Sequence, residues 1–224
     1  MTRDLHVISI HRIEYKRCLE WQRNLAAARA AGEIPDLLIL TEHEPVITVG
    51  RAGAAPAANA NVNIVNVERG GMATYHGPGQ LIGYPIIYLE ENERDVHAYL
   101  RKIEDVLIET LVQYNLSAVR EPGATGVWLL RNHTKIASIG IAVKRWVTLH
   151  GFALNVSSDL HGFDGFDPCG FPSNVMTTME KELQTPVERR DLERVLIDHF
   201  AAVFDRNAVR AGENSILQYA SRES

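Results

Sequence analysis

The sequence predicts an α+β fold, a mixed and largely antiparallel β-sheet with helices packed on it. Three long stretches have the composition or the apolar spacing of helices, and seven shorter stretches are β-branched or alternate apolar with polar residues. The strand stretches cluster in the second half of the chain without regular strand–helix–strand alternation, which argues against a doubly wound parallel sheet. With 224 residues the chain can bury a substantial core, and we expect one domain over residues 1–224.

The three helices are predicted from their spacing and their end signals. The first runs from about Glu14 to Ala31, a stretch rich in Ala, Arg and Leu, and Gly32 follows where a helix would stop. The second begins after Asp95, a favourable N-cap, and repeats apolar residues as far as Tyr114. The third covers the apolar series from Leu192 to Phe204.

The strand predictions and the connections between them complete the expected fold. Residues 131–134, "RNHT", predict a hairpin turn that delivers Lys135 to the start of a strand, and "GRAGAAPAANANVN", Gly50–Asn63, predicts a long loop. The predicted strands are Leu37–Leu40, Val46–Gly50, Asn63–Val67, Leu81–Leu89, Gly126–Leu130, Lys135–Val143 and Val147–Val156.

Composition and charge exclude several classes of protein. The hydrophobic fraction of 46% and the charged fraction of 23% are those of an ordinary soluble globular protein. A net charge of −5 argues against nucleic acid as the main partner, because phosphate binding favours a basic field. No segment approaches the ~20 apolar residues that span a bilayer, and the N-terminus lacks the apolar core of a signal peptide. With only two cysteines we expect free thiols in a reducing cytoplasm, and no membrane association.

A glycine-rich stretch, "RGGMATYHGPGQ", is the first candidate for a binding site. Its GxGxxxG spacing is not a dinucleotide fingerprint, and the chain has no GK[ST] phosphate loop. A surface turn is the alternative interpretation. Glycine lets backbone approach a ligand closely, and successive N–H groups can form an oxyanion nest. We interpret the stretch as a binding loop with Tyr75 and His76 in its wall.

Cys169 in "GFDPCGFPSN" is the candidate nucleophile. It lies between a proline and a glycine, on a constrained loop where a thiol is accessible; a buried, inert cysteine is the alternative. Cys18 falls within a helical pattern and is interpreted as a packing residue.

A thiol of pKa ~8.5 needs an activating group. The candidates are His76, His150 and Lys135, and sequence separation does not decide among them. An ammonium ~4 Å from the sulfur contributes about 4 kcal/mol at an effective dielectric near 20, enough after screening to move the thiol pKa by a unit or more. Lys135 opens an apolar strand, where its alternative role is a strand-end lysine that reaches solvent.

Five motifs, in this order, resemble those of the lipoyl(octanoyl) transferases of lipoate biosynthesis: "TEHEPVITVGR", "RGGMATYHGPGQLIGYP", "KIASIGIAV", "TLHGFALNV" and "PCG". The resemblance runs from about Glu42 to Gly170, and no substitution breaks the pattern. It implies the α/β fold of the biotin and lipoate protein ligase catalytic domain. It also implies that Cys169 accepts the acyl group and that Lys135 tunes the thiol. His150 stays a possible auxiliary residue, as one of the three candidate activating groups. The substrate-contacting residues that the resemblance implies are Arg69, Gly70, Gly71, Met72, Ala73, Thr74, Tyr75, His76, Ser138, Ile139, Gly140, Gly151, Phe152 and Ala153.

The same resemblance implies the reaction and its partners. Octanoyl-acyl carrier protein would donate the acyl group, and a lysine on the lipoyl domains of 2-oxoacid dehydrogenases or on the glycine cleavage H protein would accept it. We expect no metal or cofactor, because thioester exchange needs no ATP. We also expect a monomer. Three alternatives stay open: an ATP-dependent lipoate or biotin protein ligase, a non-catalytic protein that binds lipoyl domains or acyl carriers, and a Cys/His hydrolase.

Overall fold

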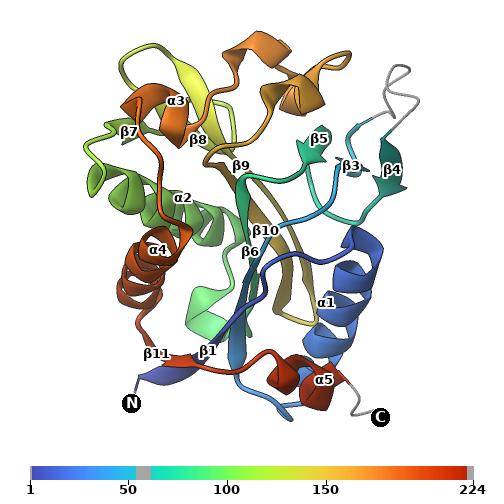
Figure 1. Ribbon diagram of the computed structural model, residues 1–224. Helices are drawn as coiled ribbons and strands as arrows, with labels where there is room; N and C mark the ends of the chain where they lie inside the picture. The colour runs from blue at the N-terminus through green and yellow to red at the C-terminus, as the bar shows by residue number, and fades with distance from the viewer. Residues whose placement is uncertain (1, 54–61, 221–224) are drawn as a thin grey trace.

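The computed structural model describes residues 2–53 and 62–220, apart from the side chains of Cys169, Leu217 and Ala220. Most of the predicted loop Gly50–Asn63 therefore lies outside the described residues. An eight-stranded sheet has the order β11-β1-β2-β6-β10-β9-β8-β7, and a separate three-stranded sheet has the order β4-β3-β5 (Figure 1). The strands are β1 (Arg3–Ser9), β2 (Asp36–Thr41), β3 (Val46–Val49), β4 (Asn63–Asn66), β5 (Ala73–His76), β6 (Gln80–Ile86), β7 (Ala118–Val119), β8 (Val127–Leu129), β9 (Thr134–Lys144), β10 (Val147–Asn155) and β11 (Arg206–Arg210).

Strand direction confirms the predicted fold class. Both pairs of β1, with β2 and with β11, are parallel, and every other neighbouring pair of the large sheet, from β2–β6 to β8–β7, is antiparallel. The long strands β9 and β10 form a hairpin in the middle of this sheet, in the register that pairs Gly140 with Gly151. The sheet is thus mixed and largely antiparallel, as predicted.

Helices cover both faces of the large sheet, α1 and α5 on one and α2 and α4 on the other (Figure 1). The α-helices are α1 (Tyr15–Ala30), α2 (Val96–Val112), α3 (Met179–Leu183), α4 (Arg189–Phe204) and α5 (Asn214–Ala220), with short 3₁₀ turns η1 (Glu91–Glu93), η2 (Leu160–Phe163), η3 (Pro168–Gly170) and η4 (Ser173–Val175). Strand β2 shows how both faces are filled. Leu37 and Ile39 pack against α1, while Leu38 and Leu40 join the core under α2 and α4, since successive side chains of a strand point to opposite faces.

The predicted helix ends are confirmed by their capping contacts. The carboxylate of Glu14 accepts hydrogen bonds from the first backbone N–H groups of α1. Gly32 follows that helix with φ +77°, a left-handed conformation that glycine adopts without strain. Asp95 accepts from the N–H groups of His97 and Ala98 at the start of α2. Local sequence therefore determines where these helices begin and end.

Four strands were not predicted: β1, β5, β7 and β11. The short β7 pairs with its neighbour β8, and the other three form through long-range pairing. β5 lies inside the glycine-rich stretch, where we expected a loop; its four residues pair antiparallel with β3, from Val46 opposite His76 to Val49 opposite Ala73. β1 and β11 pair parallel with each other at an edge of the large sheet. The composition of β11, "RNAVR", is too polar to signal a strand, so partners far along the chain decide its structure.

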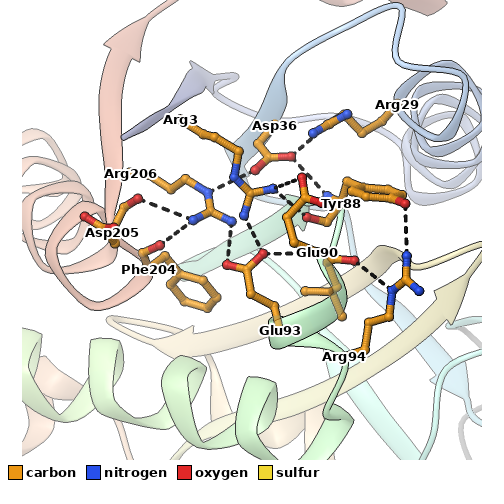
Figure 2. A network of polar contacts seen from close by, with 11 residues as sticks. Arg3, Arg29, Asp36, Tyr88, Glu90, Glu93, Arg94, Phe204, Asp205 and Arg206 are labelled. Atoms are coloured by element: carbon orange, nitrogen blue, oxygen red, sulfur yellow. Dashed lines mark hydrogen bonds and ion pairs between the residues drawn. The ribbon is translucent and has the colours of Figure 1, made fainter. Parts of the chain in front are cut away.

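A buried charge network holds this edge together (Figure 2). Asp36 on β2 is 1% exposed and accepts hydrogen bonds from Arg29 Nε at 2.7 Å, Arg206 Nε at 3.0 Å and the Tyr88 N–H at 3.0 Å. Arg206 on β11 also donates to Glu93 at 3.0 Å. The network thus joins a C-terminal strand, helix α1 and the segment after β6.

Among the described residues, no helix has both the length and the apolar character that crossing a bilayer requires.

Candidate active site

Arg69 organises the glycine-rich stretch from within. Its guanidinium donates to the carbonyl oxygens of Gly70 at 3.0 Å and Met72 at 2.8 Å, and to the carbonyl and hydroxyl oxygens of Thr48, both at 2.8 Å. The side chain is 6% exposed, so residues 69–72 wrap around a buried cation. A Cβ at Gly140 would lie 2.8 Å from Arg69 Cδ, closer than Cβ contacts allow. Hydrogen bonds from Arg69 therefore hold the predicted binding loop in one conformation, and glycine at position 140 leaves room for the arginine side chain.

The three predicted substrate-contacting segments meet around one small cavity of about 30 Å³. Its polar lining includes the hydroxyls of Thr74 and Ser138, which are buried and make no hydrogen bond within the described residues. The lining comprises Tyr15, Arg69, Thr74, His76, Tyr84, Ser138, Ile139, Gly140, His150, Gly151, Phe152 and Ala153. Nine of the fourteen predicted contact residues, together with His150, are thus brought together by strands β5, β9 and β10 and by the glycine-rich stretch.

Ala73 and Tyr75, two of the predicted contact residues, do not line the small cavity. Because residues 73–76 form a strand rather than a loop, their side chains alternate. Thr74 and His76 face the cavity, whereas Ala73 and Tyr75 pack on the opposite face in a separate apolar cluster. Tyr75 contacts Phe163 there, with ring centroids 5.4 Å apart. Tyr75 therefore does not form the wall beside His76.

A buried group of histidines and tyrosines, which the sequence did not reveal, lies beside the cavity. His43 Nδ1 donates to the Ile13 carbonyl at 2.8 Å, so its Nε2 accepts from the Tyr84 hydroxyl at 2.7 Å. The rings of Tyr15 and His76 stack with centroids 5.9 Å apart. Two signals were available: His43 lies in the quoted "TEHEP" motif, and Tyr84 alternates with the buried isoleucines of β6.

Burial keeps these histidines neutral. It lowers the pKa of His43 to about 4, and the pKa of His76 falls well below its ordinary value through burial and the neighbouring His43. Burial lowers the pKa of His150 to about 4, against the opposing attraction of Glu68. Proton transfer is most efficient when the pKa of the base lies near the working pH. His76 and His150 are therefore suited to hydrogen bonding more than to general-base catalysis at neutral pH.

Lys135 is fully buried, which rules out the alternative of a strand-end lysine that reaches solvent. Its Nζ donates to the Thr125 carbonyl at 3.1 Å and lies 5.6 Å and 5.3 Å from the ring centroids of Trp128 and Phe171. The predicted hairpin turn before β9 is confirmed, with His133 in a left-handed conformation at φ +51°. The cation thus ends among aromatic rings and a carbonyl oxygen.

The backbone of Cys169 lies in η3, and its side chain lies outside the described part of the structure. The segment that carries it is anchored beside Lys135 from its C-terminal side. Phe171 contacts the Lys135 ammonium, Met176 forms a bridge with Lys135, and the N–H of Thr177 donates to the Lys135 carbonyl at 3.0 Å. The residues that follow the "PCG" segment, Phe171 to Thr177, thus lie beside the start of β9.

A larger cleft of about 390 Å³ adjoins the small cavity. Ile139 and Gly140 line both, so the two spaces share a wall formed by β9. The volume is within the usual range of ~300–1,000 Å³ for small-molecule sites. The cleft is lined by Arg51, Gly70, Gly71, Met72, Val96, Leu100, Gly123, Ala124, Thr125, Lys135, Ile139, Gly140, Ile141 and Phe171. It unites Lys135 with the three predicted contact residues, 70–72, that are absent from the small cavity.

Cys18 lines neither the cavity nor the cleft. Cys18 is fully buried in α1, where burial raises the pKa of its thiol to about 12, and it is a packing residue as predicted. Within the described residues, no group of three or more His, Cys, Asp or Glu side chains is arranged to hold a metal ion.

The fold is that of the catalytic domain of lipoate and biotin protein ligases. A crystal structure of lipoate-protein ligase A bound with ATP superposes with a TM-score of 0.78 over 98% of this chain and 93% of that chain, at 15% identity. A biotin protein ligase from Aquifex aeolicus in complex with biotin and ATP superposes with a TM-score of 0.53 over 89% of this chain and 70% of that chain, at 9% identity. At these identities the likeness concerns the fold.

Sequence comparison then gives the family. The model of the lipoyl protein ligase A/B catalytic domain matches residues 14–201. An octanoyltransferase of Geobacter metallireducens is 43% identical over 195 residues, which cover 87% of this chain and 91% of that protein. An octanoyltransferase of Rubrobacter xylanophilus is 44% identical over 200 residues, covering 84% and 88%. The chain belongs to the lipoyl protein ligase A/B catalytic domain family, and the resemblance found in the sequence is confirmed.

Proposed function

We propose that this chain transfers an octanoyl group from octanoyl-acyl carrier protein to a lysine of a lipoyl domain, through a thioester on Cys169. The observation that carries the proposal is the identity of 43–44% to octanoyltransferases over most of both chains. The site supports it, because the buried ammonium at position 135 and Phe171, the residue after the "PCG" segment, line one cleft of suitable size. We further propose that the whole chain acts as a single catalytic domain, since the family match covers residues 14–201. We place it in the cytoplasm because a chain with two cysteines is suited to a reducing compartment.

In the first half-reaction the Cys169 thiolate attacks the thioester carbonyl of the donor. The C–S bond to the carrier breaks, and the leaving thiolate takes a proton from the Lys135 ammonium. The products are acyl-Cys169, a free carrier thiol and Lys135 as the neutral amine. Because one thioester replaces another, the step needs no activation by ATP.

In the second half-reaction the acceptor lysine must lose a proton before it attacks, since its pKa is ~10.4. The Lys135 amine takes that proton, the acceptor nitrogen bonds to the acyl carbon, and the C–S bond to Cys169 breaks. One further proton passes to solvent as the amide forms, and the thiolate and the Lys135 ammonium are restored. Formation of an amide from a thioester drives the step forward.

The tetrahedral oxyanion of both steps needs hydrogen-bond donors. The N–H of Gly170 is already engaged with the Asp167 carbonyl at 3.1 Å, and that of Gly70 with the Ile141 carbonyl at 2.9 Å. Gly71 borders the cleft with φ +81° and lies between the carbonyls that Arg69 holds. We propose its N–H as a donor to the oxyanion.

The acyl chain would occupy the space between β5, β9 and β10. Ile139, Phe152 and Ala153 supply apolar surface there, and burial of each methylene contributes about 0.8 kcal/mol. The cavity of about 30 Å³ holds about one water-sized molecule, so it must open towards the adjoining cleft when the chain enters.

Mass spectrometry after incubation with octanoyl-acyl carrier protein tests the covalent route. We expect an octanoyl adduct on Cys169 that is absent from Cys169→Ser and unchanged in Cys18→Ala, the matched variant of the other cysteine. Normal turnover by Cys169→Ser would overturn the proposal. Transfer without ATP separates it from a ligase, and release of free octanoate in place of transfer to the acceptor would indicate a hydrolase.

A further inference from the structure

The peptide group between Thr125 and Gly126 joins two buried side chains of opposite charge. Its carbonyl oxygen accepts from Lys135 Nζ at 3.1 Å, and its N–H donates to Glu104 Oε1 at 3.2 Å. The two ends of a trans peptide group point in opposite directions. One peptide therefore lies in line between the carboxylate of α2 and the ammonium of β9.

Glu104 is built into the protein as a fixed anion. It is 1% exposed, and its Oε2 accepts from Arg101 at 2.6 Å and from Arg120 at 3.0 Å. Arg120 also pairs with Asp105, the residue after Glu104 on α2. A buried carboxylate with two charged donors and one backbone donor is satisfied on both oxygens and is held in one orientation. It can therefore fix the orientation of the peptide that it binds.

Glycine at position 126 lets the lysine stem pass this peptide. Gly126 has φ +125°, and a Cβ there would lie 2.5 Å from the Ala137 carbonyl oxygen and 2.9 Å from Lys135 Cε. Gly123, three residues earlier in the same loop, also has a positive φ, but a Cβ there would meet nothing within 4 Å. Two glycines of one loop thus differ in whether they constrain Lys135.

We propose that Glu104 is a positioning residue for the acyl transfer, and that it orients the Lys135 ammonium through the Thr125–Gly126 peptide. The carboxylate polarises the N–H, which strengthens the carbonyl as an acceptor for the cation, since hydrogen bonds in a chain reinforce one another. The inference rests on the proposed role of Lys135. Glu104 itself touches neither the substrate nor the reacting atoms.

The test is Glu104→Gln, which keeps the shape and the acceptor oxygen but removes the charge. We expect kcat/KM for octanoyl transfer to fall between about tenfold and 10²-fold, the range for a reactive group displaced by up to 1 Å. We also expect the alkylation–pH profile of the Cys169 thiol, measured in a Cys18→Ala background, to shift to higher pH. Glu109→Gln, an exposed residue on the same helix, is the matched control and should change neither readout.

A double variant separates positioning from a general effect on folding. If Glu104 acts through Lys135, then Glu104→Gln added to Lys135→Met causes no further shift of the thiol profile. An equal shift in both backgrounds would overturn the inference. If Lys135→Met alone leaves the profile unchanged, the proposed role of the lysine fails; if only Glu104→Gln leaves it unchanged, the role of Glu104 alone fails.

Gly126→Ala places a methyl group against the stem of Lys135. Its result does not depend on whether a Glu104 variant folds. We expect Gly126→Ala to lower kcat more than KM rises and to shift the thiol profile upward. The control is Gly212→Ala, at an exposed glycine where a Cβ would meet nothing within 4 Å, and it should change neither readout. Identical behaviour of the two alanine variants would contradict a peptide that guides the lysine.

Discussion

Replacing Lys135 by methionine should separate activity from stability. Methionine keeps an unbranched stem of similar length and removes the charge from a side chain that is 0% exposed. The variant loses a charge-assisted hydrogen bond to the Thr125 carbonyl, about 1.5–3 kcal/mol, and cation–π contacts of up to about 2 kcal/mol. Against this, burying an ion costs several kcal/mol, and sulfur–aromatic contacts with Trp128 and Phe171 contribute about 0.3–1.5 kcal/mol each.

These opposing contributions nearly cancel. Thr125 is exposed, so water can reach its carbonyl oxygen once the ammonium is gone. We expect the free energy of unfolding to change by at most about 2 kcal/mol. Octanoyl transfer should fall by about 10²–10⁴-fold, the contribution of a positioned acid–base group. The lysine would then be retained for chemistry, at no benefit to the fold.

Urea unfolding followed by tryptophan fluorescence measures the first quantity, and a discontinuous transfer assay the second. Lys144→Met, an exposed residue at the end of the same strand, is the matched control and should leave both unchanged. Destabilisation by more than about 4 kcal/mol would show that Lys135 holds the fold together, as loss of one partner of a buried pair does. Retained transfer would remove it from the mechanism.

Three further perturbations test the site and its scaffold. Burial lowers the pKa of His43 and of His150 to about 4, so between pH ~6.5 and ~4 the unfolded chain binds more protons than the folded chain. The free energy of unfolding should therefore fall with decreasing pH, by up to about 1.4 kcal/mol per pH unit for each histidine. In urea titrations His43→Gln should flatten this slope, whereas His11→Gln, at an exposed position, should not. Arg69→Lys cannot reproduce the guanidinium fork, so we expect a loss of about 2–4 kcal/mol and faster hydrogen exchange of amides 70–72; unchanged exchange would contradict the clamp. Asp36→Ala leaves buried Arg206 without a partner on β2 and should cost about 3–5 kcal/mol, with normal transfer per folded molecule.

Local signals in the sequence predicted much of the framework. Glu14 and Asp95 cap helices because a short acidic side chain reaches the nearest free N–H groups, which requires no knowledge of the rest of the chain. The turn before Lys135 and the central strands β9 and β10 were predicted for the same reason. The residues of the site were predicted from the resemblance, and the structure brings most of them together around the cavity and the cleft.

The failures share a physical cause. β5 was expected to be a loop because its pattern is short and flanked by glycines, and it is a strand because β3 supplies its hydrogen-bond partners. That change alone turned Tyr75 away from the cavity. Lys135 has the appearance of a strand-end lysine, and only the packing of Trp128 and Phe171 around it shows that it is buried.

The sequence by itself determined the helix ends, the fold class and the family, because capping, periodicity and motif order are properties of neighbouring residues. The tertiary structure alone decided which groups share the site: the arginine clamp, the neutral histidines, and Glu104. This glutamate lies 31 positions before Lys135 and holds the Thr125–Gly126 peptide that binds the lysine. Such groups come from separate elements, and their burial and charge are created only when those elements pack together.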